Sequence, residues 1–172
     1  MTAPPPDAAL PDAAPPGPAF LGTRLRLLLD TLDRDVQAVY TDLGLPDFRP
    51  RFAPVVRAVA ARGALPIREV ALAIGVTHSA ASQTVAQMAK EGLVSLTPGD
   101  EDARQRLVRL TPEAEALLPR IDAEWAATER AAAALETELP YPLSRLVTET
   151  LAALERRPLR ERIGEVQRDA GE

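Results

Sequence analysis

Two short helical patterns, separated by a turn of only a few residues, limit the folds open to this chain more than any other part of its sequence. The stretch "PIREVALAIG" begins at Pro66, whose fixed φ and missing N–H suit the first turn of a helix. The stretch "VTHSAASQTVAQMAKEG" follows, with Thr77 as the expected N-cap and Gly92 as the C-terminal stop. Gly75 lies between them and gives the backbone freedom that a sharp turn needs. The sequence therefore predicts a helix-turn-helix.

A β-hairpin is predicted directly after the second of these helices. Two short apolar segments, 93–96 and 107–110, lie on either side of a charged, turn-rich loop. Helix, tight turn, helix and hairpin, in that order, make up a winged helix-turn-helix. We assign this domain to residues 47–111, with a recognition helix over 77–91 and a wing over 93–110.

Longer helices are predicted on both sides of that domain. In residues 19–46 and 112–165, apolar residues recur every three or four positions and form stripes. Pro119 should kink or break the second region near its start. Because each apolar stripe must be buried against another surface, both regions are interpreted as dimerisation helices. The predicted fold class is mainly α with a small β-hairpin wing, a winged helix-turn-helix core flanked by dimerisation helices.

The two ends of the chain are not expected to join the fold. Residues 1–18 hold seven of the seventeen prolines and few side chains that could be buried, so they are predicted to form a disordered tail. Residues 166–172 are predicted to be a frayed tail.

Composition excludes several other classes of protein. The chain has no Cys and one His, and it lacks both a Gly-rich phosphate loop and a nucleophile-elbow pattern. No enzymatic activity, cofactor or metal site is therefore expected. No apolar run approaches the roughly 20 residues of a membrane-spanning helix, and the N-terminus lacks a secretory pattern. We expect a cytoplasmic protein without membrane contact.

Charge is distributed unevenly along the chain. Residues 49–110 carry nine Lys and Arg against five Asp and Glu, a net charge of +4, whereas the whole chain carries −5. The middle of the chain is therefore mildly basic between acidic flanks, which permits a surface for nucleic acid.

The predicted recognition helix has one apolar face and one polar face that is almost uncharged. Ala81, Val85 and Met88 recur at i, i+4 and i+7 and should face the core. Short polar side chains opposite them would let the helix enter a major groove, where Ser and Gln exchange hydrogen bonds with base edges. An ordinary solvated helix face is the alternative. The residues predicted to contact DNA in this helix are Thr77, His78, Ser79, Ser82, Gln83 and Gln87.

The stretch from Leu65 to Ile121, which contains these residues, resembles the DNA-binding core of MarR-type transcriptional regulators. The wing of that family carries an Asp, any residue and an Arg, followed by a strand that ends in Leu-Thr. In the stretch "DARQRLVRLT" these positions are Asp102, Arg104, Leu110 and Thr111, and "KEGLV" before the wing also matches. The resemblance implies a homodimer joined through the first helix, within residues 19–46, and the fifth and sixth helices, within residues 112–165. It also implies one recognition helix per subunit in a major groove and the wing Arg in a minor groove.

The residue types in the wing suit these contacts. A narrow minor groove attracts a planar cation such as that of Arg104, and Asp102 can orient the guanidinium by a charge-assisted hydrogen bond. The predicted phosphate contacts are Arg106 and Arg109 on the returning strand and Arg68 in the helix that begins at Pro66.

The recognition helix departs from the family in one respect. Many members carry an Arg near the position of Gln83, whereas this helix has one cation, Lys90, near its end. Fewer phosphate contacts should weaken DNA binding and flatten its salt dependence, although Gln83 can still pair bidentately with adenine. A winged-helix module that binds protein rather than DNA is the alternative function.

The expected partners are double-stranded DNA and a second copy of the chain, in a regulator, more often a repressor in this family, that reads a palindromic operator. The resemblance also implies a small organic effector in a cleft between the dimerisation helices and the DNA-binding lobe. A further helix is predicted over residues 49–63. The residues that could line that cleft lie at the junction of this helix and the helix in 19–46, and they are Tyr40, Phe48 and Phe52. Plain packing is the simpler explanation for each of the three.

Overall fold

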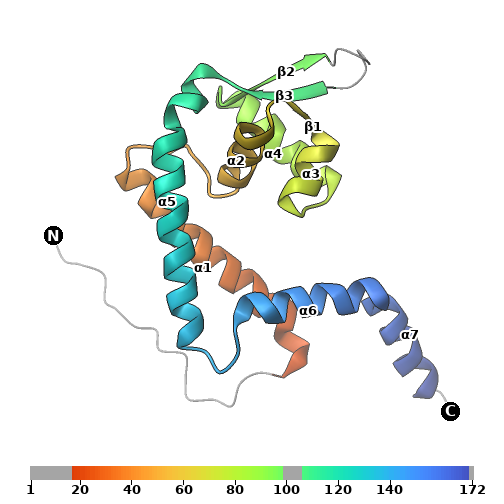
Figure 1. Ribbon diagram of the computed structural model, residues 1–172. Helices are drawn as coiled ribbons and strands as arrows, with labels where there is room; N and C mark the ends of the chain where they lie inside the picture. The colour runs from red at the N-terminus through yellow and green to blue at the C-terminus, as the bar shows by residue number, and fades with distance from the viewer. Residues whose placement is uncertain (1–16, 99–105, 171–172) are drawn as a thin grey trace. The chain divides into compact units, whose positions relative to one another are not determined.

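The computed structural model describes residues 17–98 and 106–170 (Figure 1). It is mainly helical with one small antiparallel sheet, and the predicted fold class is confirmed. In chain order the elements are η1 (Pro18–Phe20), α1 (Leu21–Asp42), α2 (Phe52–Arg62), β1 (Leu65–Pro66), α3 (Ile67–Ile74), α4 (His78–Lys90), β2 (Val94–Pro98), β3 (Arg106–Leu110), α5 (Pro112–Thr137), α6 (Leu143–Arg156) and α7 (Leu159–Asp169).

The chain divides into two compact units, with the boundary after Glu115. In the first unit α2, α3 and α4 pack against one another, and α2 and α4 also contact the sheet, as Figure 1 shows. The second unit holds the rest of α5 together with α6 and α7.

The sheet of the first unit has three strands in the order β1-β3-β2, all antiparallel. The hairpin of β2 and β3 was predicted, and its register pairs Val94 with Leu110 and Pro98 with Arg106. The strand β1 was not predicted. It is only two residues long, so it has no alternation to detect, and it exists because Leu65 pairs with Val108, far away in the sequence.

The core of the first unit is built from apolar residues at helical spacing. Val85 and Met88 of α4 are fully buried, as predicted, and they share the core with Val70 of α3. Burying each such side chain stabilises the fold by about 1.5–3 kcal/mol. The α2 contribution to this core is Phe52, Ala53, Val55, Val56 and Val59.

The turn between α3 and α4 forms as the sequence predicts. Gly75 adopts the left-handed conformation, with φ 69° and ψ 33°, which a side chain would strain. Thr77 is the N-cap of α4, and its hydroxyl oxygen accepts a hydrogen bond from the backbone N–H of Ala80 at 3.2 Å. These two residues fix where α4 begins.

Thr111 ties the end of α4 to the start of α5. Its hydroxyl donates to the carbonyl oxygen of Gly92 at 2.7 Å and accepts from the backbone N–H of Ala114 at 3.2 Å. The second bond satisfies one of the free N–H groups at the start of α5. The Leu-Thr ending of the wing strand therefore has a structural role that is independent of DNA.

In the second unit, α5 continues through Pro119, so the predicted break at this residue is wrong. Proline removes one backbone hydrogen bond, but its fixed φ is compatible with a helix, and Leu117 and Leu118 before it favour helix. The predicted kink stays a prediction.

Two local contacts define the joints around α6. A carboxylate oxygen of Glu136 accepts the backbone N–H of Ser144 at 2.6 Å, which lowers the pKa of the Glu136 carboxyl. At the other end, Arg162 of α7 donates to the carbonyl oxygens of Ala153 and Arg157, at 3.2 and 3.1 Å. The helix α7 continues to Asp169, so residues 166–169 of the predicted frayed tail are helical.

Two predictions fall on residues outside the described part of the chain. Residues 1–16 of the predicted disordered tail are among these, and so are residues 99–105 at the tip of the wing. Among the helices that the structure does describe, none combines the length and the apolar character needed to cross a membrane.

Candidate functional site

The helix α4 presents the two faces that its sequence predicts. Ala81, Val85 and Met88 are completely buried on one side. On the other side Ser79 and Gln83 are exposed, and Ser82 and Gln87 at its margins are half-buried. The exposed face is therefore polar, and its side chains can exchange hydrogen bonds with a partner without first leaving a core.

The predicted contact residues at the start of α4 differ in their structural roles. The Thr77 oxygen already accepts the Ala80 N–H, so Thr77 caps the helix, and its hydroxyl hydrogen is the group left for a partner. His78 and Ser79 are the first residues of the helix and are exposed. Free backbone N–H groups at a helix start favour negative groups such as phosphates.

Gln87 has a neighbour that the sequence did not predict. Arg51, the residue before α2, donates a hydrogen bond from Nη2 to Oε1 of Gln87. The Arg51 guanidinium also lies 5.8 Å from the centre of the Phe52 ring. The two bonded residues are 36 positions apart, so only the packing of α2 against α4 brings them together.

Other elements of the first unit carry exposed cations. Arg68 at the start of α3 and Arg106 and Arg109 of β3 are exposed, as the prediction of phosphate contacts requires. Nε of Arg109 donates to the hydroxyl of Thr97 on the paired strand at 3.2 Å, which limits its motion. Sequence reasoning missed the exposed Arg49, which, like Arg51, lies beside the start of α2.

The wing pair, Asp102 and Arg104, lies outside the described residues. The last described pair of the ladder is Pro98 with Arg106. The role of the two residues stays a prediction.

The aromatic residues predicted to line an effector cleft form a packed cluster. The Tyr40 and Phe48 rings are 4.8 Å apart between centres, and the Phe48 and Phe52 rings are 5.7 Å apart in an edge-to-face arrangement. All three side chains are buried. The geometry is that of ordinary aromatic packing, and a cleft at these residues stays a prediction.

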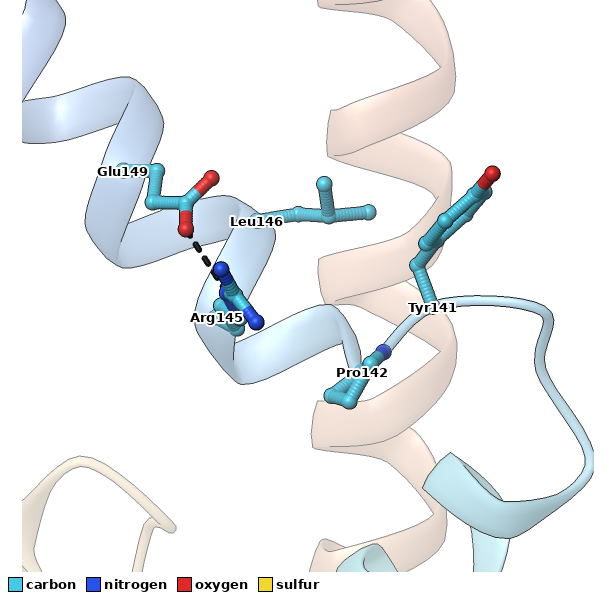
Figure 2. Close-up of a pocket in the computed structure, with 5 residues that line it drawn as sticks. All are labelled: Tyr141, Pro142, Arg145, Leu146 and Glu149. Carbon is cyan, nitrogen blue, oxygen red and sulfur yellow. Dashed lines mark hydrogen bonds and ion pairs between the residues drawn. The ribbon is translucent and has the colours of Figure 1, made fainter.

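A cavity of about 390 Å³ lies in the second unit, at the start of α6 (Figure 2). Tyr141 and Pro142 line it from the loop, and Arg145, Leu146 and Glu149 line it from the helix. The guanidinium of Arg145 is paired with the Glu149 carboxylate at 2.7 Å, and both side chains are largely exposed. Such an exposed pair contributes little to stability.

Comparisons with known proteins agree with this geometry. The model of the MarR family matches residues 50–105, so the resemblance seen in the sequence is confirmed for this segment. No curated protein matches the chain.

Solved structures resemble the chain over most of its length. The PcaV transcriptional regulator from Streptomyces coelicolor in complex with its natural ligand has a TM-score of 0.58 at 19% identity, covering 84% of this chain and 98% of that chain. A mutant MarR from E. coli complexed with operator DNA has a TM-score of 0.55 at 17% identity, covering 80% and 94%. A probable transcriptional regulator from Pseudomonas aeruginosa has a TM-score of 0.51 at 21% identity, covering 80% and 98%. At these identities the likeness shows a shared fold.

Proposed function

We propose that this chain, whose residues 50–105 match the MarR family, is a dimeric transcriptional regulator that binds specific DNA sequences. The observation that carries the proposal is the exposed polar face of α4, held on a winged-helix core whose other elements carry exposed arginines. In a winged helix-turn-helix, the helix after the tight turn is the element that enters the major groove.

The polar face of α4 suits base reading because its side chains are short and mostly uncharged. Ser79 and Ser82 can donate to or accept from base edges, and Gln83 can pair bidentately with adenine. The short residues near the start of the helix let its backbone approach the bases. Sequence is therefore read by hydrogen bonds along α4.

Attraction to the DNA backbone comes from the arginines around this helix. Arg68, Arg106 and Arg109 are the proposed phosphate contacts, and Arg49 adds to them at the start of α2. Arg104 enters the adjacent minor groove with Asp102 orienting it. Because α4 itself has one cation, Lys90, this flanking set supplies most of the salt-dependent affinity.

A second copy of the chain completes the regulator. Large apolar side chains are exposed on α1, α6 and α7, and an apolar surface of this extent marks an association site. Two-fold symmetry would place two recognition helices on one face of the DNA, about 10–11 base pairs apart. The operator is then a palindrome, and a dimer bound over a promoter represses transcription by occupying it.

We extend the proposal to a small organic effector, because the similar PcaV structure holds a natural ligand. An effector that binds better to a dimer whose helices are wrongly spaced for DNA shifts the population toward that form. Repression would then end without any change in the recognition helix itself.

A second candidate function is a winged-helix module that binds protein. The observation that favours it is the exposure of apolar residues in the helix-turn-helix: Leu72 of α3 is 72% exposed, and Val76 in the turn is also exposed. In this case Gln83→Glu would abolish capture of the partner, and DNA would have no part in the interaction.

The experiment that separates these functions is a fluorescence-anisotropy titration of the protein against the DNA upstream of its own gene and against scrambled DNA. Both titrations are run at two salt concentrations. A regulator prefers the upstream DNA and loses affinity as salt rises. Arg104→Ala should weaken binding, whereas Arg130→Ala on α5 serves as the matched loss of an exposed charge and should not.

If the protein binds both DNAs equally, the next experiment is to select preferred sequences from a random duplex library. If no sequence is enriched there, sequence-specific reading is ruled out and the protein-binding function takes its place.

A further inference from the structure

Two glutamines one helical turn apart on α4 have different hydrogen-bond environments. The Gln83 side chain is exposed and forms no hydrogen bond within the described part of the chain, whereas Gln87 is half-buried and its Oε1 is bound by Arg51. Gln83 lies on the exposed polar face of the recognition helix and Gln87 lies at the margin of that face. The same residue type therefore offers different groups to DNA at these two positions.

The chemistry of the contact fixes which end of the Gln87 amide faces Arg51. A guanidinium carries five N–H donors and no acceptor. The amide group that it contacts must be the oxygen, because the amide nitrogen is also a donor. This contact uses one of the two lone pairs of the oxygen and turns it toward Arg51, so the Nε2 hydrogens of Gln87 are the groups best placed for a partner.

Arg51 is itself held in place. It is the residue before the first turn of α2, and a tight turn fixes its backbone, because the N–H of Phe52 bonds the carbonyl oxygen of Arg49 at 2.8 Å. Its guanidinium lies over the Phe52 ring, which is completely buried. An Arg with two contacts on a rigid scaffold loses less conformational entropy when it binds than a free one.

This arrangement changes what Gln87 can read. A bidentate pair with adenine needs both amide groups, since the oxygen accepts from the adenine amino group while the nitrogen donates to N7. With its oxygen turned toward Arg51, the Gln87 amide has its two Nε2 hydrogens best placed for a base, and the neighbouring guanidinium adds more donors. Guanine is the base whose major-groove edge presents two acceptors, O6 and N7.

We propose that Arg51 is a positioning residue that holds Gln87 as a hydrogen-bond donor and so selects guanine over adenine at one position of each half-site. The inference rests on the proposed function, because it assumes that α4 lies in a major groove. It differs from a phosphate-contact role for Arg51, which would add affinity to every sequence alike.

The test is selection from a random duplex library with the full chain, followed by sequencing, for the unmodified protein and four variants. Arg51→Met removes the donor but keeps an apolar stem, and Arg51→Lys keeps both a charge and a donor. Gln87→Met removes the group that reads the base. Arg49→Met is the matched control, since Arg49 is an exposed cation two residues away that bonds Gln37 at 3.4 Å and not α4.

We expect the unmodified protein to enrich guanine at one position of each half-site. The Gln87→Met variant should show no base preference at that position. Arg51→Met should reduce the preference for guanine over adenine at that same position by roughly tenfold. Arg51→Lys should retain most of the preference, and Arg49→Met should leave it unchanged while lowering affinity for all sequences. Circular dichroism of each variant confirms that it is folded.

Three results would overturn the inference in different ways. If every variant keeps the same base preferences, Arg51 does not position Gln87, and the regulator function stands. If Arg51→Met and Arg49→Met lower affinity equally for all sequences, Arg51 is a phosphate contact. If the unmodified protein enriches no sequence, the proposed function fails, and this inference fails with it.

Discussion

The winged-helix core and the C-terminal helices α6 and α7 have similar apolar periodicity, but their apolar side chains are buried in the core and exposed in the two C-terminal helices. In the core, α2, α3 and α4 bury their apolar faces against one another and the sheet. Neither α6 nor α7 has a buried residue, and Leu151 and Leu159 are 58% and 59% exposed. An apolar stripe therefore shows that a helix face needs a cover, but not whether the chain itself supplies it.

The proposed function accounts for this difference by assigning each region its own task. The core closes on itself so that α4 is rigid and its polar face is held ready for DNA. The C-terminal helices keep their leucines for a second copy of the chain. The two regions should then respond differently to the loss of a leucine or a methionine, and this expectation can be tested.

Replacing Leu151 and Leu154 of α6 together with Ala should have the largest effect. Each substitution acts twice in a symmetric dimer, so the dissociation constant should rise on the order of 1,000-fold, about 4 kcal/mol. Sedimentation equilibrium measures the change. Glu155→Ala on the same helix is the control and should leave the dimer intact; a double variant that stays fully dimeric would show that α6 covers something else.

Met88→Ala should come next and should act on the core alone. Deleting this fully buried side chain removes apolar contacts and leaves a cavity, which costs about 2–4 kcal/mol of unfolding free energy. Thermal unfolding should shift equally at all protein concentrations, whereas the α6 variant should shift it in a concentration-dependent way. If the shift in thermal unfolding depends on protein concentration to the same extent in both variants, the two regions do not differ as proposed.

Thr111→Val tests the joint at the end of the wing. The variant loses the bond to the Gly92 carbonyl and the cap on Ala114, and we expect a loss of about 1 kcal/mol of unfolding free energy. Thr148→Val is the matched control, because its hydroxyl only donates to the Ser144 carbonyl of its own helix. If denaturant melts of the two variants agree, Thr111 has no special part in the fold.

The smallest effect is expected at Glu136, near the end of α5. Because the bound Ser144 N–H lowers the carboxyl pKa, its stabilising effect is complete above the ordinary value of 4.5 and disappears as pH falls through the lowered pKa. Hydrogen exchange at the Ser144 amide should accelerate below that pKa, beyond its intrinsic pH dependence. Glu136→Gln should remove this titration, and a variant that keeps it would assign it to another group.

Local signals in the sequence predicted much of the fold. Gly75 and Thr77 determine the turn and the start of α4 by their own backbone and side-chain preferences, which need no distant partner. The strand β1 and the Arg51–Gln87 contact were missed for the opposite reason, since each joins residues far apart in the chain. The break expected at Pro119 was wrong because one lost hydrogen bond does not end a helix of strong helix formers.

The candidate site was predicted only in part. Helical spacing placed the polar residues of α4 on one face, because that geometry depends on the helix alone. It could not show that Gln83 and Gln87 differ, since the difference comes from Arg51 just before another helix. Spacing also could not show that Tyr40, Phe48 and Phe52 pack against each other.

The most direct test of the account is sedimentation velocity of the protein with a fluorescent duplex recovered by the library selection. The account predicts two protomers on each duplex, with two inverted half-sites about 10–11 base pairs apart. It also predicts loss of the complex when Leu151 and Leu154 are both replaced by Ala. A single protomer that binds the duplex with the same affinity as the unmodified protein, despite that double substitution, would contradict it.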